Sequence, residues 1–288
     1  MRGTLHFVAA EDVRWMQGLL APRVIARDKA RIERDFGLDA ATLKRCRRIV
    51  DKALADGTPM TRSALYAALD AGGIASAGLR GVHVTGRLAH EGLLCLGPRA
   101  GKQPTFVLLD AWLPATPHKT RDEALAELAR RYFRSHGPAT AQDFAWWSGL
   151  TVKDAQAGIA LAQAQLVRDD IDGAAHWRSL DALQPADANS VHLLPPFDEY
   201  LVGYRNRSAA IDATHGRQVI GINGLVNASI VVDGRVVGTW KRSIGKDAVT
   251  ITPAFLMPRP AKRASEAAIR REARRYGVFL GVRGTLAV

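Results

Sequence analysis

Cysteine is scarce in this chain, and long apolar runs are lacking. Its 288 residues include two cysteines, Cys46 and Cys95, which are too far apart to form a Cys-x-x-Cys metal motif. A disulfide framework needs more cysteines than this, so we predict two reduced core thiols in a cytoplasmic protein. No segment approaches the ~18 apolar residues of a membrane helix, and Glu11 and Asp12 interrupt the region where a signal peptide has its apolar core. We expect no metal site and no membrane association.

Motifs of the common enzyme classes are missing as well. The sequence contains no GxSxG, no GxGxxG, no CxxC and no phosphate-binding GxxxxGKS or GxxxxGKT. His90 and Glu91 begin an HExxH zinc motif, but Leu94 stands where the second histidine would be. We therefore expect no cofactor.

Asp198 and Glu199 form the most conspicuous pair of carboxylates. They lie in a segment that looks extended, in which neighbouring side chains point to opposite faces of a strand. Two carboxylates arranged in that way do not easily act on one substrate. We predict a structural role for the pair, in which one of the two bonds Arg205 or Arg207.

Basic residues outnumber acidic ones. The chain has 40 Lys and Arg against 28 Asp and Glu, a net charge of +12. A polyanion such as nucleic acid is the usual partner for such a field, and the alternative is solubility alone or the Arg-rich usage of a GC-rich genome. The excess lies in residues 1–118 and 186–288, whereas 119–185 is slightly acidic. This uneven distribution favours nucleic acid.

The stretch 120–166 has the start and stop signals of three short helices. Thr120, Thr140 and Thr151 are each followed three positions later by an acidic residue, a pattern typical of helix starts. Asp172-Gly173 then forms a two-residue turn between strand-like runs. Three helices followed by a hairpin is the winged-helix pattern.

An internal repeat extends this interpretation toward the N-terminus. Residues 53–73 match 130–150 by role: a helix end, a Gly, a Pro, a Thr cap, a short helix with aromatic residues and a Gly turn. The first copy would have its third helix over about 79–94 and its wing loop over 98–104. A helix capped by Asp39 precedes it, and the earlier residues suggest a strand at 1–8 and helical segments at 11–20 and 24–36.

The fold class that follows is α+β: tandem winged-helix (helix-turn-helix plus wing) modules followed by a β-rich C-terminal domain with a closing helix. The β-rich assignment rests on strand-like runs over 191–256 and a hairpin signal at Asp233-Gly234. We divide the chain into an N-terminal strand and helical segment (1–36), a winged-helix module (37–118), a second winged-helix module (119–185) and the C-terminal domain (186–288).

Candidate DNA contacts gather in the first copy. A basic stripe runs along one side of its third helix, the helix that a winged helix inserts in the major groove, and the wing loop adds groups suited to phosphate or minor-groove contact. The alternative is an ordinary solvated face. The predicted DNA-binding residues are Arg80, His83, Arg87, His90, Arg99, Lys102, Gln103, Lys241 and Arg242. The second copy carries acids in its hairpin, which would repel phosphates, so we predict that it is structural.

Five stretches in family order resemble bacterial AlkZ-like winged-helix DNA glycosylases. They are RGTLHFV at 2–8, GLLCLGPRAGKQPTFVLLDAWLP at 92–114, HGPATAQDFAWWSGLT at 136–151, LLPPFDEYLVGYRNRS at 193–208 and VVDGRVVGTWKR at 231–242. The resemblance implies tandem winged-helix modules and a β-rich domain around a DNA-binding concavity, and excision of alkylated or crosslinked bases.

One departure from the family pattern bears on mechanism. The resemblance implies a further N-terminal winged helix with a Gln-x-Gln or Gln-x-Asp motif that positions the attacking water, whereas this sequence begins at the RGTLH segment. Its only early glutamine, Gln17, has Leu19 where the second polar residue should be. No catalytic residue can therefore be carried over from the family. We expect a monomer that binds double-stranded DNA without excising bases.

Two alternatives stay open. The protein is an active glycosylase if the natural gene begins upstream or if a residue near His6 substitutes for the glutamines. It is a transcriptional regulator if a dimer reads a palindrome, although no long dimerisation helix or ligand domain is evident.

Overall fold

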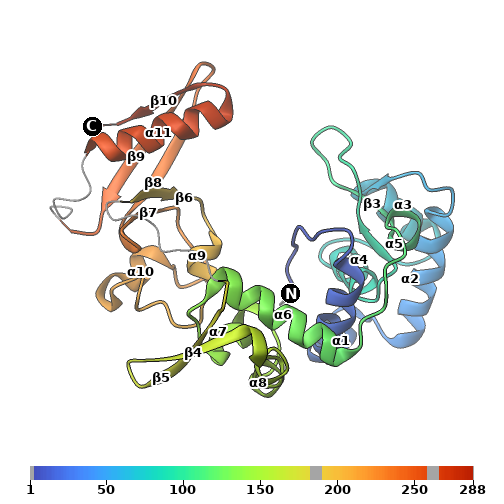
Figure 1. Cartoon of the computed structure of the whole chain (residues 1–288). Coiled ribbons are helices and arrows are strands. Elements are labelled where there is room, and N and C mark those ends of the chain that lie inside the picture. Colours follow the sequence, from blue (N-terminus) through green and yellow to red (C-terminus); the bar gives the residue numbers. More distant parts are fainter. Residues whose placement is uncertain (1–2, 182–189, 258–265, 288) are drawn as a thin grey trace. The chain divides into compact units, whose positions relative to one another are not determined.

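The computed structural model describes residues 3–181, 190–257 and 266–287 and forms two compact units (Figure 1). The first unit consists of Met1–Arg131 and Ser148–Gln165, and the second of Tyr132–Trp147 and Leu166–Val288. Helices account for 47% of the chain and strands for 21%, so the fold class is α+β, as expected. The predicted domain boundaries at 36, 118 and 185 stay predictions.

The N-terminal segment differs from its prediction. Residues 3–8 form no strand, and Leu5 and Phe7 are exposed, because no other strand pairs with them. The two predicted helical segments are one helix, α1 (Val13–Phe36), which continues through Pro22. A proline inside a helix removes one backbone hydrogen bond, and the buried apolar face of α1 offsets that loss.

The first repeat contains three longer helices, a small antiparallel sheet and one short helix after the sheet. Asp39 caps its first helix, α2 (Ala40–Ala53), by accepting the Thr42 N–H at 2.7 Å, and Thr61 caps α3 (Arg62–Ala71). The remaining elements are α4 (Arg80–His90), β1 (Met60–Thr61), β2 (Leu94–Leu96), β3 (Thr105–Leu108) and α5 (Leu109–Trp112), with strand order β1-β3-β2. Three helices and the sheet enclose one apolar core.

The second repeat follows the same order of elements. They are α6 (Arg121–His136), α7 (Ala141–Ser148), α8 (Val152–Leu161), η1 (Gln163–Gln165), β4 (Leu166–Ile171) and β5 (Ala174–Ser179). Ala139, two residues before α7, pairs with Trp177 of β5, as Met60, two residues before α3, pairs with Phe106 of β3. Asp172 and Gly173 have φ of 51° and 74°, the left-handed turn that the sequence predicts.

The C-terminal part of the second unit contains a curled half-barrel sheet. Within the described residues its strands are β6 (Val191–Leu194), β7 (Ser229–Val232), β8 (Arg235–Ile244), β9 (Ala248–Phe255) and β10 (Arg283–Leu286), in the order β10-β9-β8-β7-β6. Only the β9–β10 pair is parallel among these. A register shift between Ile230 and Val231 bends the sheet.

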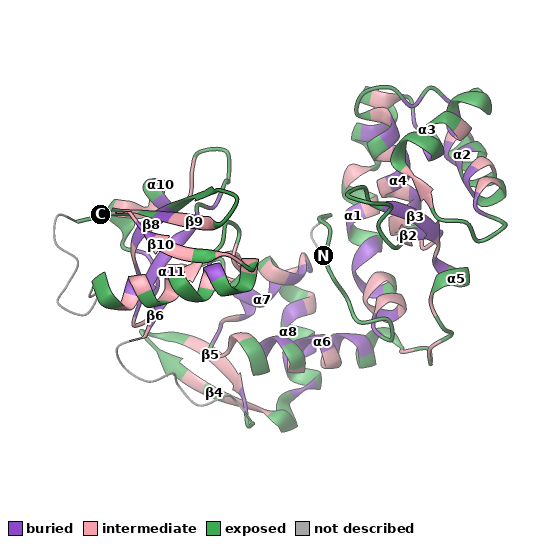
Figure 2. Cartoon of the chain, turned by 90° about the horizontal axis from the view of Figure 1, so that it is seen from above, coloured by how far each residue is buried: buried purple, intermediate pink, exposed green. Residues whose placement is uncertain are grey.

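Both faces of this sheet are covered. Helix α11 (Glu266–Leu280) packs its buried Ile269 and Ala273 against one face together with Trp240, as the sequence predicts for the helix. The short elements α9 (Glu199–Val202), η2 (Ala213–His215) and α10 (Gly216–Val219) lie in the segment that covers the other. Buried residues follow the strands, while the outer side of α11 is exposed (Figure 2).

Two glycines let α11 approach β10 at backbone distance. A Cβ on Gly277 would lie 2.2 Å from the Gly284 nitrogen, and a Cβ on Gly284 would lie 1.9 Å from the Ala273 oxygen. No side chain fits at either place, so the helix and the strand could not lie this close with any other residue.

We predict that Gly284→Ala lowers the free energy of unfolding by about 1–3 kcal/mol, the usual cost of overpacking, because the added methyl meets helix backbone. Gly216→Ala is the matched control, since a Cβ there meets nothing within 4 Å. Urea unfolding followed by circular dichroism measures both. Equal midpoints for the two variants would contradict the close approach.

Candidate nucleic-acid interface

The predicted basic stripe on α4 lies against α1. Arg80 donates from Nε to the Phe36 carbonyl at 2.8 Å, and from Nη1 to the Ala75 carbonyl at 3.0 Å. The His83 ring lies 4.1 Å from the Phe36 ring, measured between centroids. These side chains thus hold the last turn of α1, and Arg80 satisfies the Phe36 carbonyl that the helix end leaves without a partner.

Arg87 and His90, the other half of the stripe, are also partly covered by neighbouring groups. Arg87 pairs with Glu91 at 2.6 Å, and its side chain is 17% exposed. Burial lowers the pKa of His83 and of His90 below the ordinary value for histidine, so both imidazoles are neutral at pH 7 and add no positive charge. The spacing placed the four residues on one side of α4 as predicted, but that side is not an open surface.

The wing loop presents the other predicted contacts to solvent. Ala100 and Gln103 exchange backbone hydrogen bonds at 3.0 and 3.1 Å, and Gly101 has a φ of 61°, so the loop ends in a tight turn that contains Lys102. Arg99, Lys102 and Gln103 are exposed, and neither of the two cations has an ion pair among the described residues. The loop stands out between β2 and β3 (Figure 1).

A basic face of α2 was not among the predicted contacts. Five cations on this helix are exposed: Lys44, Arg45, Arg47, Arg48 and Lys52. Arg47 lies 3.7 Å from Glu91, and Asp51 is the one acid on the helix. The helical period already placed these side chains outward, and that was the signal from which the face could have been proposed.

In the second unit, Lys241 and Arg242 differ in their surroundings although both are exposed. Arg242 lies over the Tyr276 ring of α11, 5.7 Å from its centroid, and donates to the Tyr276 hydroxyl. Lys241 points to the opposite face of β8, because side chains alternate along a strand. The two residues are therefore not brought together on one face.

Two of the stretches that carry the family resemblance meet in the second unit. Glu199 accepts the Trp147 indole N–H at 2.5 Å and lies 3.2 Å from His136 Nε2. Buried Asp143 accepts the backbone N–H groups of Arg205 and Asn206 at 2.9 and 3.1 Å. These contacts join α6 and α7 to the segment around α9.

Asp198 and Glu199 both make contacts that hold this part of the fold, and the predicted bond from one of them to Arg205 or Arg207 stays a prediction. Asp198 caps α9 by accepting the Tyr200 N–H, and Arg207 donates from Nε to the Leu201 carbonyl of that helix. The segment is a turn and a short helix instead of a strand. Its long-range partners, His136 and Trp147, could not be identified from local sequence.

The acids of the second hairpin are paired with arginines. Asp169 lies 2.8 Å from Arg178, and Asp170 lies 3.2 Å from Arg168. Their charges are therefore partly compensated within the hairpin. Among the residues that the structure describes, no group of three or more His, Cys, Asp or Glu is placed to hold a metal, and no helix there is long and apolar enough to cross a membrane.

The fold and the family comparison define a DNA glycosylase class. The chain belongs to the DNA glycosylase AlkZ-like family, whose model matches residues 1–279. It is similar to an interstrand DNA cross-link repair glycosylase of Streptomyces sahachiroi, with 29% identity over 178 residues, 58% of this chain and 47% of that protein. The solved structure of Streptomyces sahachiroi DNA glycosylase AlkZ superposes with a TM-score of 0.76 at 25% identity, over all of this chain and 80% of that one.

The chain spans about half the length of the curated relative that it matches. The predicted lack of a catalytic module stays a prediction.

We predict that Arg80→Ala lowers the free energy of unfolding by about 1–3 kcal/mol, because it leaves two carbonyls without their donor. Arg48→Ala, on the exposed face of α2, is the control and should change it by less than about 0.5 kcal/mol. Urea unfolding measures stability, and fluorescence anisotropy with duplex DNA measures affinity. Unchanged stability together with lost affinity would instead support the predicted α4 contact.

Proposed function

We propose that this protein binds double-stranded DNA, with the exposed wing loop of the first repeat as its principal contact in the first unit. The observation that carries the proposal is that Arg99 and Lys102, which have no ion pair in the part of the chain that the structure describes, lie exposed on the hairpin loop of a member of a DNA glycosylase family. Gln103 beside them can donate to and accept from base edges.

We interpret both repeats as winged-helix modules. Each has three helices, then a hairpin, and a residue before the second helix that pairs with the second hairpin strand. In the first module the hairpin is the wing and α4 is the third helix. The covered side of α4 supports a division of roles in which Arg80, His83, Arg87 and His90 position the wing and the end of α1.

Charge supports the same partner. A net charge of +12 favours encounter with a polyanion, and the cations without acidic partners are the ones free to replace counterions on phosphates. The face of α2 and the residues Lys241 and Arg242 extend the proposed contact beyond the wing loop.

Base excision is the second candidate function, on alkylated or crosslinked DNA. The observation that favours it is the family match together with the repair glycosylase of Streptomyces sahachiroi. Within the first unit, Gln17 is not placed as a group that positions water, because its amide donates to the Ala89 carbonyl of α4. We therefore propose binding without excision as the function of these residues.

We predict that Lys102→Glu weakens duplex binding about tenfold and lowers the slope of log affinity against log salt by about one, as the loss of one phosphate contact would. Lys153→Glu is the matched control, because Lys153 is equally exposed but lies on α8 of the second repeat. Fluorescence anisotropy at several salt concentrations measures both. Equal effects would refute the assignment of the wing, and no salt dependence in the unsubstituted protein would refute DNA binding by basic groups.

We also predict that the protein releases no bases from alkylated duplex DNA, because hydrolysis needs a positioned water and stabilisation of the developing sugar cation. Chromatography of the supernatant detects free bases. Release that disappears in Lys102→Glu would establish the second candidate function, since a contaminating glycosylase would be unaffected by that substitution.

A further inference from the structure

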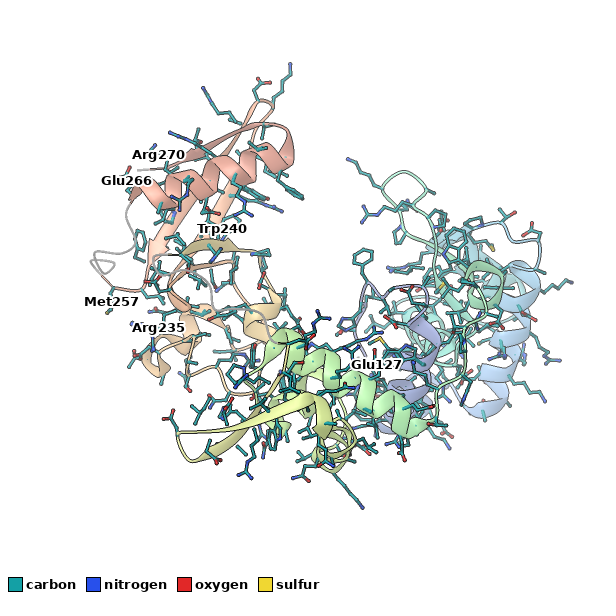
Figure 3. The ribbon with its side chains drawn as sticks, in the orientation of Figure 1. Glu127, Arg235, Trp240, Met257, Glu266 and Arg270 are labelled. Atoms are coloured by element: carbon teal, nitrogen blue, oxygen red, sulfur yellow. The ribbon has the colours of Figure 1, made fainter. Side chains whose placement is uncertain are left out.

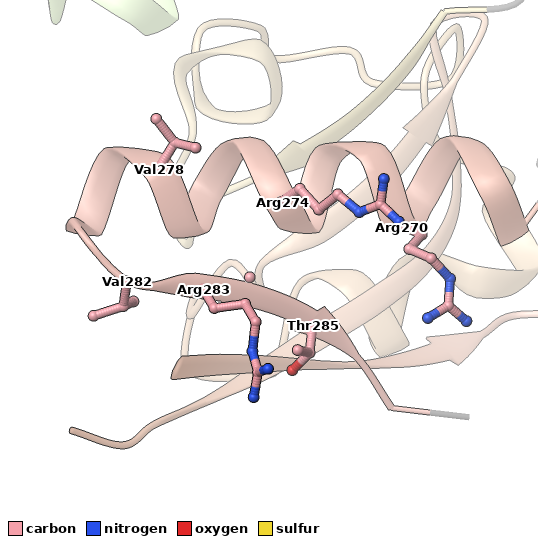
Figure 4. A pocket seen from close by; sticks show the side chains of 7 residues that line it. Arg270, Arg274, Val278, Val282, Arg283 and Thr285 are labelled. Carbon is pink, nitrogen blue, oxygen red and sulfur yellow. The ribbon is translucent and has the colours of Figure 1, made fainter. Parts of the chain in front are cut away.

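A basic hollow lies on the second unit, and its lining contains none of the predicted DNA-binding residues. It has a volume of about 420 Å³ and is lined by α11 and β10 (Figure 4). Three arginines contribute to it, Arg270 and Arg274 from the helix and Arg283 from the strand, with Val278 and Val282 as apolar neighbours.

The hollow follows from the close approach of α11 to β10. Gly277 and Gly284 bring the two backbones together, and the helical period places Arg270, Arg274 and Val278 four residues apart along one side of α11. Arg283 is the first residue of β10, beside them. Cations from two different elements thus face one space.

The arginines of α11 differ in whether acids neutralise them. Arg271 and Arg275 lie 3.7 and 3.5 Å from Glu272. Arg270 is paired with Glu266 at the start of the helix (Figure 3).

Arg274 and Arg283 have no ion pair among the described residues, and both are exposed. Two guanidinium groups that line one hollow repel each other unless an anion lies between them.

We propose that this hollow binds a phosphodiester of a DNA backbone, through Arg274 and Arg283 with Arg270 as a weaker third donor. Guanidinium groups match phosphate oxygens in bidentate geometry. The volume exceeds that of a single phosphate, and the valines offer an apolar wall to the deoxyribose. The inference rests on the proposed DNA binding and adds a second place of contact to it.

The sheet connects this hollow to a basic turn. The Arg283 N–H donates to the Asp247 carbonyl at 3.1 Å, in the turn between β8 and β9. That turn also carries Lys246, which is exposed, beside the carboxylate of Asp247.

The test compares two pairs of substitutions on the same surface with equal loss of charge. Arg274→Gln with Arg283→Gln removes the proposed site, and Arg271→Gln with Arg275→Gln removes two cations of α11 that are paired with Glu272. Fluorescence anisotropy with duplex DNA should give a roughly tenfold loss of affinity and a salt slope lower by about one to two for the first pair. The second pair should change affinity less than about threefold. Circular dichroism confirms that both pairs are folded.

The remaining outcomes separate this inference from the proposed function. Equal effects of the two pairs in a protein that binds DNA would overturn the hollow and leave DNA binding intact, whereas absence of duplex binding in the unsubstituted protein would overturn both. A third variant, Arg274→Lys with Arg283→Lys, keeps the charge and should bind with intermediate affinity, because lysine lacks the bidentate fork. Binding of inorganic phosphate that only the first pair abolishes, with equal DNA affinities for both pairs, would assign the hollow to a free phosphate compound and overturn the DNA contact.

Discussion

Repulsion among 40 basic side chains is the constraint under which this fold forms. Carboxylates relieve it locally, and they do so unevenly. Glu127 forms ion pairs with both Arg130 and Arg131, and Glu272 forms ion pairs with both Arg271 and Arg275. The paired cations stabilise helices and contacts within a unit, so the cations without acids mark the surfaces where an external anion would lower the free energy most.

The contact between α1 and α4 decides which predicted residues can serve as such a surface. Helical spacing correctly grouped Arg80, His83, Arg87 and His90, but spacing defines a side of a helix and not what covers it. Here Phe36 and the carbonyl end of α1 cover it. The wing loop escapes this ambiguity, because a tight hairpin turn with polar ends has no neighbour that could bury it.

Most of the fold could be predicted from local signals in the sequence. The threonine caps and the Asp-Gly turns depend on residues within a few positions of one another, and the structure confirms them at Thr61, Thr151 and Asp172. The missing strand at residues 3–8 and the distant donors to Glu199 were both beyond local sequence, since a strand needs a partner strand and a carboxylate needs its donors. Those partners lie far away in the sequence, and no periodicity encodes them.

Glycine explains why the hollow on α11 could not be predicted from the arginines alone. The sequence places Arg270, Arg274 and Arg283 on a helix and on a later strand, without stating how far apart those elements lie. Gly277 and Gly284 reduce that separation to backbone contact, which turns a solvated helix face into one wall of a shared site. A substitution at either glycine would separate the cations while leaving every charge in place, so the geometry of this site depends on two residues that carry no functional group.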